Sequence, residues 1–210
     1  MRTTFLSLLL LGLLALTAGA SDASGYEDVM RAELARLDSA AQPADYLQCR
    51  NRFERMAQMY AGQWLPVYYT AYCDLQMTYM KQPNVPALLQ DAKALLEKLE
   101  AFDEADPSEV QTLWGYYYMA LIATDPSTGQ TYFMQTISSY EKAMKLNPAN
   151  PRPVCLLAFF RQQLPPAMRS GRDIAEGKQK AEALFRQETP SPLKPYWGAY
   201  FLQMIRTENN

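Results

Sequence analysis

Apolar side chains recur at intervals of three and four residues along almost the whole chain beyond residue 25. This spacing places them on one side of an α-helix, whereas the alternating pattern typical of β-strands is not sustained over a useful length. Within residues 86–102, for example, Leu88, Ala92, Leu95 and Leu99 share one face of a helix. The pattern predicts an all-α fold of about nine helices. They are expected at residues 26–40, 45–60, 64–80, 86–102, 108–124, 130–146, 151–163, 173–188 and 191–206.

The clearest helix boundary lies at residues 140–153, which read YEKAMKLNPANPRP. Asn147 ends the first helix, because a residue before proline is pushed out of the α region. Asn150 can cap the next helix, with Pro151 at the first helical position, where a missing N–H costs nothing. The stretch therefore predicts the end of one helix, a tight turn and the start of the next.

Two other helix starts carry capping residues. Asp106 is expected to cap the helix that follows it, with Pro107 in the first position and Glu109 placed to bond back to the cap. Asp173 and Glu176 form a second pair of this kind. The sequence therefore predicts both helix starts together with their caps.

The expected helix starts repeat at a nearly constant interval. One set falls near residues 64, 108, 151 and 191 and the other near 45, 86, 130 and 173, so both sets step by about 40 to 44 residues. The pair Trp114-Gly115 recurs as Trp197-Gly198, and a small residue at such a position lets two helices approach closely. A fixed period of helix pairs is typical of a solenoid.

Residues 140–148 match the pattern aromatic-x-x-Ala-x-x-Leu-x-Pro, and through it the chain resembles the tetratricopeptide (TPR) repeat family. The resemblance covers most of residues 26–206 and implies a right-handed α-solenoid of antiparallel helix pairs, with Gly115 and Tyr140 between the two helices of one pair. The period is near 43 residues here, against about 34 in the standard repeat. Another α-solenoid and an ordinary helical bundle therefore remain alternatives.

The first twenty residues differ from the rest of the chain. Arg2 provides a positive start, residues 5–16 are mostly apolar, and residues 18–20 read Ala-Gly-Ala. This order is typical of a cleavable secretory signal peptide, and the apolar run is too short to span a bilayer. We expect cleavage after Ala20, which leaves residues 21–210 as one helical domain, with an uncleaved anchor as the alternative. No Cys lies near this site, so a lipoprotein anchor is not expected.

The charge of the chain argues against nucleic acid as a partner. There are 20 Lys and Arg residues against 22 Asp and Glu residues, and the basic ones form no patch. No later hydrophobic run is long enough and free enough of charge to span a membrane. The chain also resembles small secreted TPR-like proteins of Gram-negative bacteria. We therefore expect a periplasmic or secreted protein with no transmembrane span after signal cleavage.

The sequence offers little for catalysis. It contains no His, which removes the commonest general base, a usual zinc ligand and the usual Ser or Cys triads. It also contains no Gly-rich phosphate loop and no paired-Cys metal motif. The acidic cluster of residues 97–106 lacks the ligand spacing of an EF-hand and is interpreted as a solvated helix end. We expect no enzyme activity, no metal site and no cofactor.

Three cysteines remain in the exported chain, namely Cys49, Cys73 and Cys155. Cys49 and Cys73 are expected on consecutive antiparallel helices, at similar heights from the turn near Gly62, so a disulfide between them is geometrically possible. Two buried, inert thiols are the favoured interpretation, with the disulfide as the alternative. Cys155 has no evident partner.

Aromatic residues concentrate on the helices expected to begin near residues 64, 108, 151 and 191. In TPR proteins this set lines the concave surface, and the resemblance maps ten positions onto that surface. They are Tyr68, Tyr72, Glu109, Thr112, Tyr116, Met119, Arg152, Phe159, Gln162 and Gln163. Aromatic and amide side chains in such a strip suit an extended peptide or a partner helix. The main hypothesis is therefore a non-catalytic scaffold that binds a protein or peptide partner.

Two other functions remain open. Tyr and Trp faces also stack on sugars, so a small-molecule carrier or a glycan-binding accessory protein is the alternative. An enzyme is the third class, although the sequence shows no site for one. The aromatic residues could also simply fill the core between the helices.

Overall fold

The computed structural model describes residues 25–80 and 83–206, so the expected signal peptide at residues 1–20 lies outside the described residues. The described part of the chain is all-α and contains no strand, which confirms the predicted fold class. No helix in these ranges is long and apolar enough to cross a bilayer.

Eight of the nine expected helices agree with the structure to within three residues at each end. The first is helical at residues 25–38. The others are α2 (Pro43–Met59), α3 (Trp64–Thr78), α4 (Val85–Leu99), α5 (Pro107–Thr124), α6 (Gly129–Leu146), α7 (Pro151–Gln163) and α8 (Gly171–Phe185). Short 3-10 helices, η1 (Pro126–Thr128) and η2 (Pro166–Met168), precede α6 and α8. Only the last expected helix differs in kind, as described below.

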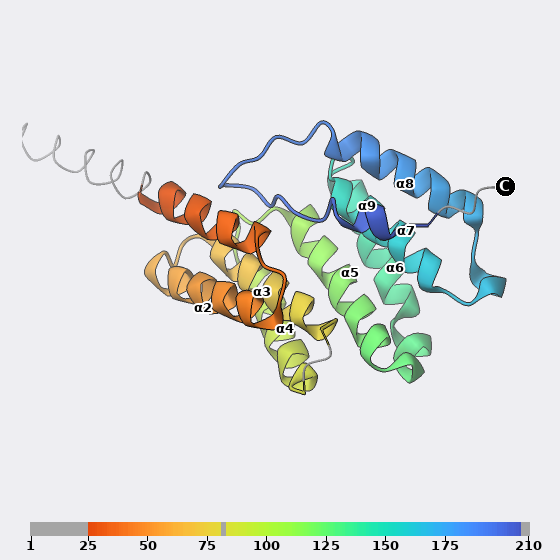
Figure 1. The fold of residues 1–210 in the computed structure, drawn as a ribbon, viewed down its shortest axis with the longest axis horizontal. Helices are drawn as coiled ribbons and strands as arrows, with labels where there is room; N and C mark the ends of the chain where they lie inside the picture. The colour runs from red at the N-terminus through yellow and green to blue at the C-terminus, as the bar shows by residue number, and fades with distance from the viewer. Residues whose placement is uncertain (1–24, 81–82, 207–210) are drawn as a thin grey trace, which may run out of the picture.

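The helices stack side by side in chain order (Figure 1). Each helix from α2 to α8 packs against its neighbours in the chain, and α5 also contacts both α3 and α7. We call α3, α5 and α7 the inner row. These are the helices on which the sequence concentrates its aromatic residues. The arrangement agrees with stacked helix pairs, while the TPR-like solenoid remains our interpretation of it.

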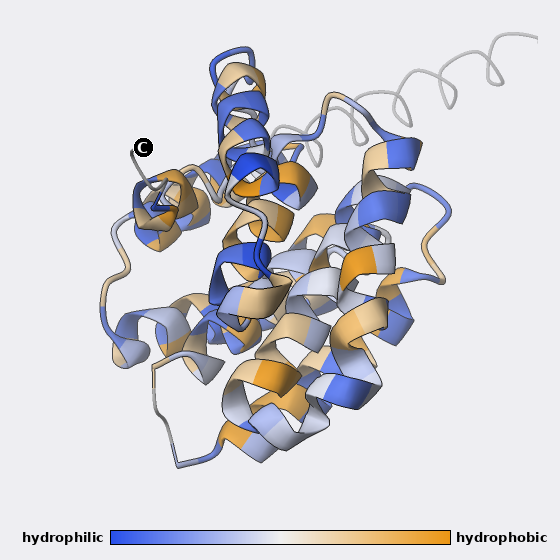
Figure 2. Ribbon diagram, turned by 90° about the vertical axis from the view of Figure 1, so that its right-hand side faces the viewer, coloured by the Kyte–Doolittle hydropathy of each residue, from blue (hydrophilic) through white to orange (hydrophobic). Residues whose placement is uncertain are grey.

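Hydrophobic and hydrophilic residues are interspersed along the helices (Figure 2). The amphipathic helix α4 buries one face, with Leu88, Ala92, Leu96 and Leu99 inside and its charged residues outside. In contrast, α3 is buried along its whole length from Leu65 to Thr78. A helix that is buried on all sides lies at the centre of a core, and α3 occupies that place here although it also carries polar residues such as Asp74 and Gln76.

Two close approaches between helices depend on small residues. A Cβ atom added at Gly115 in α5 would lie 2.5 Å from the Tyr140 ring in α6, and one added at Gly177 in α8 would lie 2.9 Å from Ala158 Cβ in α7. Gly115 and Tyr140 therefore meet between paired helices, as the sequence predicted. The ring of Tyr140 is fully buried there.

The predicted caps are partly confirmed. The Asp106 side chain accepts hydrogen bonds from the N–H groups of Ser108 and Glu109, and Asn150 caps α7 through the N–H of Arg152. The cap of α8 is Ser170 rather than the expected Asp173. Glu109 does not bond back to its cap either, because its carboxylate points inward to other partners.

The helix expected at residues 191–206 is replaced by an irregular segment that ends in the four-residue helix α9 (Phe201–Met204). Pro195 would lie inside the expected helix, where proline removes a hydrogen bond and clashes with the preceding turn. Gly198 has a φ of 97°, a left-handed conformation that favours glycine. Trp197-Gly198 is therefore not a helical counterpart of Trp114-Gly115.

We predict that Gly115→Ala destabilises the fold by about 1–3 kcal/mol, because the added methyl group overpacks the buried α5–α6 contact. Gly129→Ala is the matched control. Gly129 has helical backbone angles at the start of α6 and nothing within 4 Å of an added Cβ, so that change should be neutral or slightly stabilising. Chemical denaturation of both variants measures the difference, and equal stabilities would contradict the close approach.

Candidate functional site

The C-terminal segment, residues 189–206, lies against the aromatic side of the inner row. Figure 1 shows it leaving α8, passing toward the N-terminal helix and returning to α9 beside α7. The backbone N–H of Tyr196 donates to the Tyr69 hydroxyl at 3.0 Å, and Gln76 donates to the Tyr200 hydroxyl at 2.6 Å. The segment is therefore bound to α3 by both its backbone and its side chains.

Two large side chains of the C-terminal segment enter the core. The Trp197 ring centroid lies 4.5 Å from that of Tyr72 and 6.1 Å from that of Tyr116. The Phe201 ring packs 5.1 Å from Phe159 and 6.0 Å from Tyr116. Aromatic pairs at these distances add to the free energy of burial, so the segment is an integral part of the fold.

A buried guanidinium joins the C-terminal segment to the helices. Arg152 in α7 donates to Glu109 at 3.0 Å, to Glu188 at 2.6 Å and to the backbone carbonyl of Pro195. Its side chain is only 2% exposed, and the guanidinium carbon lies 5.9 Å from the centre of the Trp197 ring. One cation therefore contacts α5, the end of α8 and the C-terminal segment.

Glu109 is the buried acidic partner of Arg152 in this network. Its carboxylate accepts hydrogen bonds from Tyr68 at 2.8 Å and from Asn150 at 2.9 Å, in addition to the bond from Arg152. The Tyr68 hydroxyl in turn accepts from the Trp197 indole N–H at 2.8 Å. Burial raises the pKa of Glu109 to about 7, and the charge of Arg152 limits the rise. The network explains why polar residues occur in the middle of an apolar core.

Seven of the ten residues mapped to a concave groove are buried in the structure. They are Tyr68, Tyr72, Glu109, Thr112, Tyr116, Met119 and Arg152. The C-terminal segment covers much of this face, so a partner could reach those residues only by displacing it. Partner binding at these positions therefore stays a prediction. Phe159, Gln162 and Gln163 are more accessible and lie together at one end of α7.

The three cysteines are buried free thiols in the structure. Burial is the main reason that the pKa values of Cys73 and Cys155 are raised, which keeps both thiols protonated and unreactive. The disulfide between Cys49 and Cys73 is not formed here and stays a prediction for the oxidised protein.

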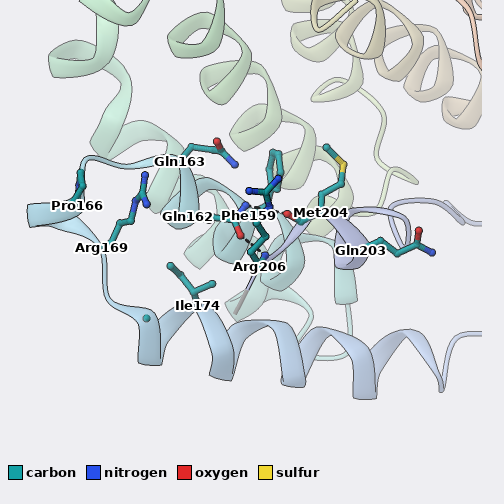
Figure 3. A pocket seen from close by; sticks show the side chains of 10 residues that line it. Phe159, Gln162, Gln163, Pro166, Arg169, Ile174, Gln203, Met204 and Arg206 are labelled. Atoms are coloured by element: carbon teal, nitrogen blue, oxygen red, sulfur yellow. Dashed lines mark hydrogen bonds between the residues drawn. The ribbon is translucent and has the colours of Figure 1, made fainter. Parts of the chain in front are cut away.

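The three accessible groove residues border a cleft of about 1040 Å³ between α7, α8 and the C-terminal segment, which we call the α7–α8 cleft (Figure 3). Its lining residues are Phe159, Gln162, Gln163, Pro166, Arg169, Gly171, Ile174, Gln203, Met204 and Arg206. The cleft is larger than most small-molecule sites, which span about 300–1,000 Å³.

Gln162 holds the rim of the α7–α8 cleft in place. Its amide nitrogen donates to the backbone carbonyl of Met204 at 3.0 Å, and its amide oxygen accepts from the backbone N–H of Arg206. Both bonds run from α7 to the end of the C-terminal segment. They fix the stretch that carries the Met204 and Arg206 side chains into the cleft.

The α7–α8 cleft combines positive charge with apolar surface. Among the described residues, Arg169 and Arg206 are the charged side chains that line it, and no acidic residue does so. Phe159, Ile174 and Met204 provide the apolar part. Such a site suits a ligand with a flat apolar body and negatively charged groups at its edge.

Most of the residues that line this cleft were not predicted from the sequence. Arg169 lies in the loop before α8 and Gly171 is the first residue of α8, whereas Gln203, Met204 and Arg206 lie where a longer helix was expected. One signal in the sequence argued against the longer helix. Pro195 lies three residues after Pro192, and a proline inside a helix breaks it. Among the described residues, no group of three or more His, Cys, Asp or Glu side chains could hold a metal ion.

We predict that Arg152→Ala destabilises the fold by about 3–5 kcal/mol, because it leaves the Glu109 carboxylate buried without its counter-charge. Arg172→Ala is the matched control, since Arg172 is exposed and, among the described residues, pairs only with Glu176 one turn away, so its loss should cost less than about 1 kcal/mol. Chemical denaturation compares the two variants. The double variant Arg152→Met with Glu109→Gln should recover part of the loss, and equal effects of the two Arg→Ala changes would contradict the role of the network.

No protein-family profile matches this chain, and comparison with curated proteins gives no match. Among solved structures, the chain is similar to the HusA haemophore from Porphyromonas gingivalis, with a TM-score of 0.77 and 26% sequence identity. The similarity covers 88% of this chain and 94% of the haemophore. It therefore extends over most of both chains.

Proposed function

We propose that this protein is an exported, non-catalytic carrier that binds a haem-like tetrapyrrole in the α7–α8 cleft. The observation that carries the proposal is the pairing of Arg169 and Arg206 with an apolar wall in one large cleft. The similarity to HusA supports it, because that protein is named as a haemophore, a carrier of haem. The proposal favours the small-molecule alternative over the protein or peptide partner.

The chemistry of the cleft fits a haem-like ligand. Haem is a flat, largely apolar ring with two carboxylates on one edge. Phe159 and Ile174 offer apolar contact for the ring, and Arg169 and Arg206 offer partners for the carboxylates. The volume of about 1040 Å³ is ample for such a ligand.

The sequence limits how the iron of a haem could be held. The chain contains no His, so the imidazole ligand of globins and peroxidases is not available. Met204 lines the cleft and is 48% exposed, and methionine is one of the residues that ligate haem iron in other proteins. Met204 is therefore our candidate for contact with the metal.

The peptide-binding hypothesis receives less support. The face that the sequence assigned to a peptide is already covered by the C-terminal segment, through contacts such as Trp197 on Tyr72 and Phe201 on Phe159. A peptide from another protein would have to displace the C-terminal segment from this face.

A cleavable signal peptide at residues 1–20 and a single domain at residues 21–210 remain part of the proposal, and a haem carrier would be useful outside the cytoplasm.

We predict that haemin binds the purified protein and that the double variant Arg169→Ala with Arg206→Ala binds it about tenfold more weakly, since two charge-assisted contacts are lost. Haemin absorbance and quenching of tryptophan fluorescence follow the titration. Arg55→Ala is the matched control, because Arg55 is an exposed arginine on α2 and lines neither this cleft nor its rim.

The dimethyl ester of haemin tests the same contacts from the ligand side. It keeps the ring and the iron but lacks both negative charges, so it should bind the wild type weakly and distinguish poorly between wild type and double variant. Equal affinity of wild type and double variant for haemin, or an equal loss in Arg55→Ala, would overturn the assignment to this cleft.

A further inference from the structure

A second cleft, of about 630 Å³, lies where the C-terminal segment crosses the helix at residues 25–38 and α3. It shares no lining residue with the α7–α8 cleft. We call it the aromatic cleft, because Tyr46, Tyr72, Tyr196, Trp197 and Tyr200 are among its lining residues. Its volume lies within the range of about 300–1,000 Å³ for small-molecule sites.

The aromatic rings that line the aromatic cleft differ in their exposure to solvent. Tyr196 and Tyr200 are 40% and 41% exposed, whereas Tyr72 and Trp197 are buried and lie with their centroids 4.5 Å apart. The Tyr196 side chain makes no hydrogen bond or ring contact within the described part of the chain, since only its backbone N–H is bonded, to Tyr69. Its ring is therefore free to pack on a ligand.

The charges at the aromatic cleft are negative. Asp38 and Glu188 line it, and no Lys or Arg is among the described residues that do so. Glu188 already pairs with the buried Arg152. The Asp38 carboxylate has no hydrogen bond or ion pair within the described ranges, so it is the acidic group that remains for a ligand.

We propose that the aromatic cleft binds a small organic cation, with an ammonium group held over the tyrosine rings and beside Asp38. The faces of aromatic rings carry partial negative charge and attract cations, most strongly where water is excluded. A carboxylate at the edge adds direct attraction. The same charges disfavour the carboxylates of a haem-like ligand, so the two clefts select ligands of opposite charge.

Choline and its uncharged isostere, in which a tert-butyl group replaces the trimethylammonium group, test this inference. The two ligands have nearly the same shape, so any difference in affinity reports on the charge. We expect choline to bind, by calorimetry or by NMR shifts of the cleft residues, and the isostere to bind at least fivefold more weakly. Binding of choline should also weaken as ionic strength rises.

Three variants identify the groups responsible. Asp38→Asn should weaken choline binding about two- to fivefold, whereas Asp28→Asn, an exposed carboxylate on the same helix that lines neither cleft, should not change it. Tyr196→Leu should weaken it about two- to fivefold, and Tyr196→Phe should leave it intact because the ring is kept.

Several results would overturn the inference. They are equal affinity for choline and its isostere, no binding of choline, an unchanged affinity in Asp38→Asn, or binding of a neutral sugar in place of choline. Haemin binding is not involved in any of these measurements, so failure here is distinguishable from failure of the proposed haem-carrier function.

Discussion

The buried guanidinium of Arg152 is the interaction on which the arrangement of this protein depends. Removing a charge from water costs several kcal/mol, and only close partners with good geometry recover that cost. Arg152 has such partners in Glu109, Glu188 and the Pro195 carbonyl. Because those partners come from α5, the end of α8 and the C-terminal segment, the charge can be satisfied only when all three meet at α7. The network therefore selects one position for the C-terminal segment.

The position of the C-terminal segment then determines both clefts. Its residues 196–200 form part of the aromatic cleft, and its residues 203, 204 and 206 form part of the α7–α8 cleft. The first cleft carries the carboxylate of Asp38, which pairs with no described residue, and the second carries Arg169 and Arg206. A segment that was expected to extend a row of helices instead lies against the inner row, so both of these clefts lie along its borders. This explains why a small ligand suits the structure better than an extended peptide.

The sequence predicted the helices well because their signals are local. Each of these signals depends only on residues close to it in the sequence. Examples are the leucine stripe of residues 86–102, the cap at Asn150 and the proline after Asn147. The contact of Gly115 with Tyr140 agrees with the placement that the resemblance to TPR repeats implied. The site was not predicted, because Glu109, Arg152 and Trp197 find each other only across the folded chain. Glu109 and Arg152 were assigned to an open groove from the sequence, whereas in the structure they form a buried network of hydrogen bonds.

Hydrogen–deuterium exchange with and without haemin is the decisive measurement, because it reports on each segment in one experiment. If haemin binds in the α7–α8 cleft, it should slow exchange at residues 159–174 and 203–206, which surround that cleft. Exchange in the helix at residues 25–38 should not change, and residues 196–201 should be well protected in both states. Slower exchange at the inner row together with faster exchange at residues 196–201 would mean that the ligand displaces the C-terminal segment, which would contradict the account.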